Sequence, residues 1–172
     1  MKARKRRPIS GQRNIFLEYS ISRILISLLL VVTANTAAWA AARALHARWD
    51  APLDGGRTLR DGTRLLGAHK TWRGLIAAVV ACGIAAQLLR LGFGLGAAFG
   101  ALALLGDAAS SFVKRRLRMR PGAEVLGLDQ LVEATLPLIV LQRPLGLGLL
   151  DILIVTSAFA LLDVAATKAR HL

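Results

Sequence analysis

Apolar residues occur in long, nearly uninterrupted runs, and this pattern limits the fold more than any other feature of the chain. Five runs can be marked, at residues 24–42, 72–89, 92–112, 128–141 and 147–166. A transmembrane helix needs about 20 predominantly apolar residues. The fourth run is shorter and carries Asp129, Glu133 and Pro137, so we expect it to continue into the preceding loop or to face a protein interior. The pattern predicts an all-α, polytopic integral membrane bundle of about five transmembrane helices.

The overall composition excludes several other classes of protein. Of the 172 residues, 55% are hydrophobic and 19% are charged, and the mean hydropathy is +0.52. These values exclude a disordered chain, a collagen and a disulfide scaffold. The single cysteine, Cys82, lies within an apolar run. It cannot form an internal disulfide or a thiolate metal cluster, and we expect a small core residue there.

Basic residues lie mostly between the apolar runs. The chain has 23 Lys and Arg against 10 Asp and Glu, a net charge of +13. In a membrane protein this excess fits anionic lipid head groups or a phosphate-rich ligand, and not nucleic acid. The connections at residues 43–73 and 114–127 are long and hold seven and five Lys and Arg, whereas the other two are tight turns. The positive-inside rule predicts that both long basic loops are cytoplasmic, on the inner membrane.

The N-terminal tail does not fit this topology as simply. Six of its first 13 residues are basic, and a five-span arrangement would place them on the outer side. Either residues 15–23 form an amphipathic interfacial helix, or the first apolar segment does not cross fully. We expect residues 1–23 to form a basic tail and residues 24–172 to form a single transmembrane domain.

Asp107 begins the most informative stretch of the sequence. Ser111 and Lys114 follow it by four and then three more residues, a spacing that places all three on one helix face. A carboxylate, a hydroxyl and an ammonium on one stripe can hold a divalent ion and a phosphate together. The alternative is a helix end whose cations reach the membrane interface. An acid one turn inside an apolar run is costly, however, and favours a functional role.

A second acidic pair opens the fourth apolar run. Asp129 and Glu133 are spaced i, i+4, so both project from one helix face. They could serve only to stabilise the N-terminus of that helix. Together with Asp107, they could supply oxygen ligands to Mg²⁺, which proteins usually bind through one or two carboxylates plus substrate phosphates.

The first long loop ends in a glycine-bounded block that contains His69, Lys70, Thr71 and Arg73. Backbone N–H groups, a point charge and a hydroxyl ahead of a helix resemble a phosphate cradle in their chemistry. The Walker A spacing is absent, so a P-loop is excluded. We expect His69 to be a hydrogen-bonding neighbour, because no second histidine lies at a spacing suited to a metal site.

Taken together, these blocks resemble the CDP-archaeol synthase family, which is similar to the larger CTP:phosphatidate cytidylyltransferases (CDP-diacylglycerol synthases). The resemblance is carried by Gly67-x-His69-Lys70-Thr71-x-Arg73-Gly74, Gly106-Asp107-x-x-x-Ser111-Phe112-x-Lys114-Arg115-Arg116, Pro121-Gly122-Ala123 and Leu128-Asp129-Gln130. The order of the blocks and the five-span layout match from about Asp54 to the C-terminus, which is most of the chain.

The resemblance implies transfer of CMP from CTP to a lipid phosphate, with release of pyrophosphate. It implies that the catalytic residues are Asp107, Lys114 and Asp129, of which the two acids bind the divalent metal. The implied phosphate and nucleotide contacts are Lys70, Thr71, Arg73, Ser111, Lys114, Arg115 and Arg116. Archaeal members carry an acid three residues after the Asp of the Asp-Gln pair, where this sequence has Val132. Either Glu133 substitutes from the next helical position, or the metal site has lost a ligand.

The chemistry of this reaction needs no covalent nucleophile, and the sequence shows no Ser-His or Cys-His arrangement. We expect direct in-line attack by the lipid phosphate, with Mg²⁺ and cationic side chains neutralising charge. The expected partners are CTP, a lipid phosphate such as phosphatidate and the membrane lipids, with a homodimer left open. The alternative is a non-catalytic membrane protein whose basic loops bind anionic lipid or a partner protein. A transporter is disfavoured, because the acids cluster near one membrane face and no inverted repeat is visible.

Overall fold

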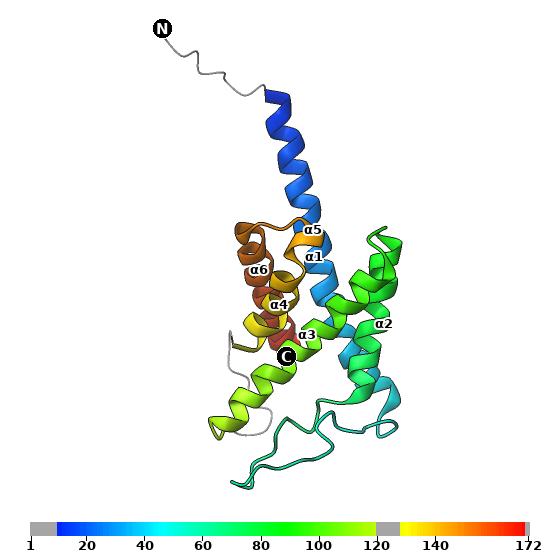
Figure 1. The fold of residues 1–172 in the computed structure, drawn as a ribbon, viewed down its shortest axis with the longest axis vertical. Coiled ribbons are helices and arrows are strands. Elements are labelled where there is room, and N and C mark those ends of the chain that lie inside the picture. Colours follow the sequence, from blue (N-terminus) through cyan, green and yellow to red (C-terminus); the bar gives the residue numbers. More distant parts are fainter. Residues whose placement is uncertain (1–9, 120–127, 171–172) are drawn as a thin grey trace.

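The computed structural model describes the backbone of residues 10–119 and 128–170, and the side chains of residues 20–119 and 130–168. Over these residues the chain is helical, and its only β-structure consists of two isolated bridges in the first long loop. Figure 1 shows the helices α1 (Ser10–Leu45), α2 (Trp72–Leu88), α3 (Phe93–Arg116), α4 (Leu128–Val140), α5 (Gln142–Leu145) and α6 (Leu149–Arg170). The prediction of an all-α fold is confirmed.

The five predicted runs fall on α1, α2, α3, α4 and α6, with ends that differ from those of the helices. Three stretches are long and apolar enough to cross a membrane: Ser20–Leu45, Phe93–Arg116 and Leu149–Lys168. Trp72–Leu88 and Gln130–Val140 are shorter apolar helices. As expected, α4 turns part of its surface toward the protein interior, where Glu133 and Leu138 are buried. The chain is thus an integral membrane helical bundle.

The long basic loop and the end of α3 lie at the same end of the bundle. Figure 1 shows the loop between α1 and α2 beside the C-terminal end of α3, whereas the α2–α3 turn and α5 lie at the opposite end. The predicted tight turn after α4 contains the single-turn helix α5, which ends at Gly146 in a left-handed conformation with φ of 65°. This arrangement gathers the charged segments at one end of an apolar bundle.

The first helix is longer than its apolar run. It contains 36 residues, which corresponds to about 54 Å at 1.5 Å per residue, and it has no break at residue 23. Figure 1 shows its N-terminal part extending away from the other helices. Arg23 donates a hydrogen bond to the carbonyl oxygen of Gly146, which ties α1 to the connection before α6.

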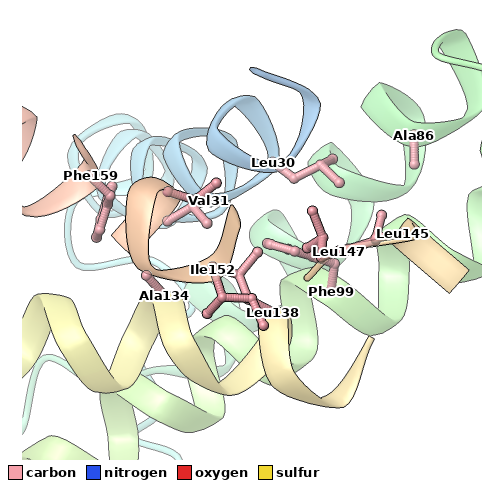
Figure 2. Packing of buried hydrophobic residues seen from close by; sticks show 11 residues of the cluster. Leu30, Val31, Ala86, Phe99, Ala134, Leu138, Leu145, Leu147, Ile152 and Phe159 are labelled. Carbon is pink, nitrogen blue, oxygen red and sulfur yellow. The ribbon is translucent and has the colours of Figure 1, made fainter. Parts of the chain in front are cut away.

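Close packing of α1, α3, α4 and α6 forms the main core. Figure 2 shows Leu30, Val31, Phe99, Leu138 and Ile152 meeting in this cluster. The helices α2 and α3 approach more closely still, because a Cβ on Gly100 would lie 2.5 Å from the carbonyl oxygen of Ala78. Such contact requires small residues, as in other membrane helix pairs. Cys82 is fully buried in a neighbouring cluster, as predicted.

Candidate active site

An ion pair joins the first long loop to α3. The ammonium nitrogen of Lys70 lies 2.5 Å from Oδ2 of Asp107, and their side chains are only 11% and 20% exposed. Thr71 follows as the N-cap of α2, where its hydroxyl accepts a hydrogen bond from the N–H of Gly74 at 3.4 Å. The cap fixes where the loop ends, and so sets the position of Lys70 beside α3. Two predicted site residues from distant parts of the chain therefore meet.

Next to Asp107, the backbones of α3 and α4 are in contact. A Cβ on Gly106 would lie 2.6 Å from the carbonyl oxygen of Val132 and 3.0 Å from Cα of Glu133. Only glycine permits this approach. Glu133 is buried, with 8% of its surface exposed, and it has interactions of its own. The residues that follow Asp129 on α4 are thus brought against the turn of α3 that carries Asp107.

The predicted metal set is only partly within the described residues. Asp129 belongs to the backbone of α4, but its side chain lies outside the described part. Among the described side chains, no group of three His, Cys, Asp or Glu residues is close enough to hold a metal ion. The helix contact at Gly106 brings the α3 and α4 segments together, and binding of Mg²⁺ by Asp107, Asp129 and Glu133 stays a prediction.

Beyond Asp107, α3 carries a buried hydroxyl after one turn and two buried cations after two turns. Ser111, Lys114 and Arg115 expose only 2%, 8% and 9% of their surface. The hydroxyl of Ser110 donates a hydrogen bond to the carbonyl oxygen of Asp107 at 2.9 Å. The hydroxyl of Ser111, by contrast, has no hydrogen-bond partner among the described residues. A buried polar group normally has a partner, and an anionic ligand oxygen would supply one here.

Two predicted nucleotide-binding arginines hold the first long loop in shape. Arg73 donates hydrogen bonds to the carbonyl oxygens of His46 and Arg48, and its guanidinium lies 2.8 Å from Oδ1 of Asp50. These contacts fix the segment that follows α1. This role could not be predicted from the sequence, because the partners of Arg73 carry no periodic or motif signal.

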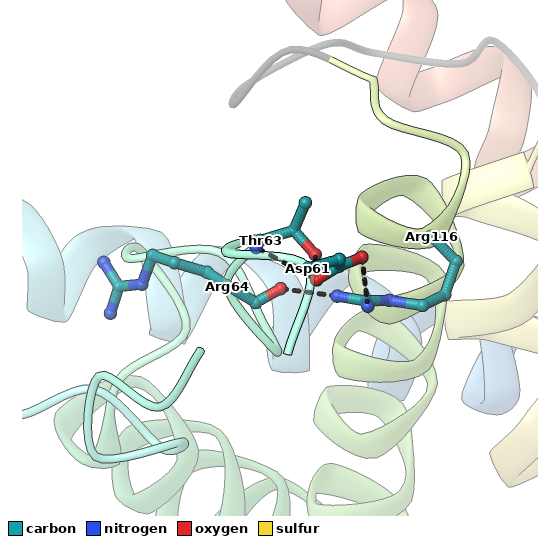
Figure 3. Close-up of polar contacts among 4 residues, drawn as sticks. All are labelled: Asp61, Thr63, Arg64 and Arg116. Atoms are coloured by element: carbon teal, nitrogen blue, oxygen red, sulfur yellow. Dashed lines mark hydrogen bonds and ion pairs between the residues drawn. The ribbon is translucent and has the colours of Figure 1, made fainter. Parts of the chain in front are cut away.

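Arg116 ties the middle of the same loop to the end of α3. Its guanidinium lies 3.3 Å from Oδ2 of Asp61 and donates to the carbonyl oxygen of Arg64 at 2.9 Å (Figure 3). The hydroxyl of Thr63 donates to Oδ1 of Asp61 at 2.7 Å. Hydrogen bonds from Thr63, more than the charge of Arg116, lower the pKa of Asp61. The nucleotide-binding role of Arg73 and Arg116 stays a prediction.

Asp54 organises the remainder of the loop. Its two carboxylate oxygens each accept a hydrogen bond of 2.9 Å, from the N–H groups of Gly56 and Leu66, and Arg64 lies 3.5 Å away. Burial acts to raise the pKa of Asp54, but the hydrogen bonds and the Arg64 charge outweigh it and lower the pKa. The Asp54 carboxylate therefore stabilises the conformation of the loop.

Two pockets flank this site. One of about 430 Å³ lies at the end of α3 and is lined by Thr63, Arg64, Leu66, Gly67, Ala68, Arg115, Arg118 and Met119. The other, of about 240 Å³, contains the Lys70–Asp107 pair together with Asn35, Ala38, Trp39, Ala42, His69, Thr71, Gly74 and Leu104. The contribution of α1 to the second pocket was missed by the sequence analysis. The available signal was Asn35, a polar side chain inside the first apolar run.

His69 lies among the charges of this second pocket. The protein atoms around its ring reduce its hydration and lower its pKa, and the positive charge of Lys70 adds to this effect. Asp107 acts in the opposite direction, while Lys114 and Arg115 lower the pKa further. His69 is therefore neutral at pH 7, and its role as a hydrogen-bonding neighbour stays a prediction.

Comparison with known proteins gives consistent results over most of the chain. A protein-family model described as CarS-like, CDP-archaeol synthase, matches residues 20–95 and 89–168. The CDP-archaeol synthase of Thermofilum pendens is 38% identical over 117 residues, which cover 65% of this chain and 57% of that protein. The CDP-archaeol synthase of Thermococcus onnurineus is 45% identical over 92 residues, covering 46% of this chain and 54% of that protein. The chain thus spans little more than half the length of these curated relatives.

A solved structure shares the fold. It is described as an intramembrane enzyme for archaeal membrane lipids biosynthesis, and it is 35% identical in sequence with a TM-score of 0.69. The similarity covers 84% of this chain and 92% of that chain. The helical arrangement described above is therefore that of a membrane enzyme structure already solved.

Proposed function

Because the chain belongs to the CDP-archaeol synthase family, we propose that it transfers CMP from CTP to a membrane lipid phosphate, forming a CDP-lipid and pyrophosphate. The contact between Gly106 and residues 132 and 133 carries this proposal. It sets Asp107 beside the acidic segment of α4, about two helical turns from the buried cations Lys114 and Arg115. The reaction brings together two polyanions, CTP and a lipid phosphate. It therefore requires acidic residues and cationic side chains in one place.

The nucleotide is proposed to occupy the larger pocket. Its volume of about 430 Å³ is in the range of small-molecule sites, and Arg64, Arg115 and Arg118 line it. These residues lie in the loop or at the end of α3, where a hydrated triphosphate can reach them. The triphosphate would extend from this pocket toward Lys114 and Ser111, whose buried hydroxyl has no partner among the described residues.

The acidic residues fit a divalent cation in their chemistry. Asp107, Asp129 and Glu133 would hold Mg²⁺, with substrate phosphates completing its oxygen ligands. When bound, the ion would offset the negative charge of the phosphate groups. On α4, Glu133 is buried against α3 whereas Val132 is only partly buried. This difference favours Glu133 as the substitute for the acid that archaeal members carry one residue earlier.

The proposed reaction is a direct displacement. An oxygen of the lipid phosphate attacks the α-phosphorus of CTP, and the bond from that phosphorus to pyrophosphate breaks. Lys70 donates hydrogen bonds to phosphate oxygens after leaving Asp107, and the hydroxyl of Ser111 donates a hydrogen bond to a phosphate oxygen. Lys114 and Arg115 stabilise the negative charge that leaves with pyrophosphate. The protein thus acts by positioning and electrostatics.

The proposed location is the inner membrane, with the active site toward the cytoplasm. The two long loops carry seven and five Lys and Arg, and basic loops face the cytoplasm in most membrane proteins. Cytoplasmic CTP would reach the site directly from that side, while the lipid phosphate would come from the surrounding leaflet.

The proposal is tested with purified protein, radiolabelled CTP, Mg²⁺ and dioleoyl phosphatidate in detergent micelles. We expect a labelled CDP-lipid that requires both the lipid phosphate and Mg²⁺. A lipid-dependent product that is absent when EDTA is added would support the function. If no lipid phosphate in a panel of diacyl, dialkyl and polyprenyl substrates yields a CDP-lipid, the chain is a non-catalytic binding protein.

A further inference from the structure

One side of the smaller pocket is formed by helix α1, which none of the sequence motifs had placed near the site. Helix α1 contributes Asn35, Ala38, Trp39 and Ala42 to the pocket that contains Lys70 and Asp107. These positions follow the spacing i, i+3, i+4, i+7, so they form one continuous helix face. The ion pair thus lies at the end of a space whose side is built from the first membrane-spanning helix.

Asn35 is the polar member of that face. It lies within the span Ser20–Leu45, and its amide makes no hydrogen bond to any of the described residues. The lipid side of a span offers no water to satisfy an amide, so polar residues inside spans are costly and mark ligand sites. The pocket places this amide next to charged groups of the proposed active site.

Neighbouring residues define the depth of Asn35 in the membrane. The guanidinium of Arg43 lies 4.7 Å from the centre of the Trp39 ring, and Trp39 is exposed on the outside of the bundle. An exposed Trp stacked under an Arg is typical of the membrane–water interface. Asn35 lies eight residues before Arg43, about 12 Å deeper along the helix axis. This level is below the lipid phosphates, toward the ester or ether oxygens and the chains of a phospholipid.

We propose that Asn35 binds the glycerol-backbone oxygens of the lipid phosphate, whose phosphate group lies toward Lys70. This inference rests on the proposed function and deepens it. An amide can donate to ester or ether oxygens without introducing a charge, which suits a site inside an apolar span. CTP is a poor occupant of this pocket, because its triphosphate would have to lose water beside the apolar face of α1.

The variant Asn35→Leu tests the inference. Leucine keeps the branched shape of the side chain, removes the hydrogen bond and favours a membrane helix, so we expect a folded protein. The matched control is Thr36→Ala, since Thr36 is an exposed neighbour outside the pocket. With dioleoyl phosphatidate, Asn35→Leu should raise the KM for lipid about tenfold, the effect of one lost buried hydrogen bond. The KM for CTP should not change.

The second part of the test uses a polyprenyl phosphate, because this lipid has no glycerol oxygens. Asn35→Leu should leave its KM unchanged if the amide binds glycerol oxygens. An equal rise for both lipids, a rise in the KM for CTP, or no change for phosphatidate would each overturn the inference. Binding of phosphatidate without CTP, followed by native mass spectrometry of wild type and variant, separates the two proposals. A protein that binds phosphatidate through Asn35 but makes no CDP-lipid would overturn only the proposed function.

Discussion

The backbone of α3 meets the backbone of α4 at Gly106 and Val132, where a Cβ on the glycine would lie 2.6 Å from the valine carbonyl oxygen. Because Asp107 follows Gly106 and Glu133 follows Val132, this one contact sets the separation of the acidic segments. The arrangement of the proposed site thus depends on the absence of a side chain one residue before the predicted metal-binding acid.

Replacing Gly106 should therefore separate the two helices. Gly106→Ala puts a methyl group into the α4 backbone, and we expect a destabilisation of about 1–3 kcal/mol together with a large loss of CMP transfer. The control is Gly94→Ala on the same helix, where a Cβ would meet nothing within 4 Å. Thermal unfolding in detergent and the CDP-lipid assay measure both effects. Equal behaviour of the two variants would contradict the role given to this contact.

Asp107→Asn should abolish CMP transfer, with a fall of at least about 100-fold, and leave the protein folded. The substitution keeps the shape of the side chain but removes the charge that Lys70 contacts. Asp151→Asn is the control, because Asp151 accepts a hydrogen bond from Gly148 at the other end of the bundle and an amide oxygen can still accept it. Retained transfer in Asp107→Asn would remove Asp107 from the catalytic site.

Adjacent serines on α3 allow a direct test of the proposed phosphate contact. Ser111→Ala removes a buried hydroxyl that has no partner among the described residues, so stability should stay the same or rise slightly. Transfer should nevertheless fall, with a higher KM for CTP. Ser110→Ala removes a hydroxyl that already donates a hydrogen bond to the backbone carbonyl oxygen of Asp107, and it should change the KM for CTP little. Initial rates over a range of CTP concentrations distinguish the two.

The contact between Arg116 and Asp61 should matter for the nucleotide more than for stability. Both side chains are partly exposed, and exposed ion pairs add little to the free energy of unfolding. They hold Thr63 and Arg64, however, which line the larger pocket. We expect Asp61→Asn to raise the KM for CTP severalfold and to leave the KM for lipid unchanged. A rise in both would show a general disturbance of the fold.

His69 should titrate below its ordinary pKa of 6.5, because burial and then the Lys70 charge oppose protonation. A depressed histidine pKa means that the folded state resists protonation, so its stability contribution is present above pH 6.5 and is lost as the pH falls. Lys70→Met removes one lowering charge and should raise the pKa of His69. The ¹³C shift of its ring followed over pH, with His69→Gln for assignment, measures the value. A midpoint above 6.5 in wild type would contradict this.

Much of the fold could be predicted because membrane helices are specified by local hydropathy. The predicted run 72–89 and the helix Trp72–Leu88 differ by one residue, and the spacing of Asp107, Ser111 and Lys114 correctly placed them on one helix. The contact of Gly106 with α4 was not predicted, because pairing of two helices depends on tertiary packing that one sequence does not reveal.

The roles of loop residues were harder to predict for the same reason. Arg73 and Arg116 lie in blocks typical of phosphate binding, yet their guanidinium groups contact carbonyl and carboxylate oxygens elsewhere in the loop. Such contacts depend on an irregular backbone without a period. Asn35 was overlooked because a single amide inside a span gains meaning only when Lys70 and Asp107 lie near it.

Helix α4 has 13 residues and is about 20 Å long, whereas the hydrocarbon core of a bilayer is about 30 Å thick. If its α5 end sits at the far boundary, Asp129 at the start of the described helix lies some 10 Å below the near one. The lipid phosphate then reacts within its leaflet, at a site below the level of the head groups. CTP then enters the membrane region to reach that site, and the protein needs a polar cleft that is only wide enough for a nucleotide.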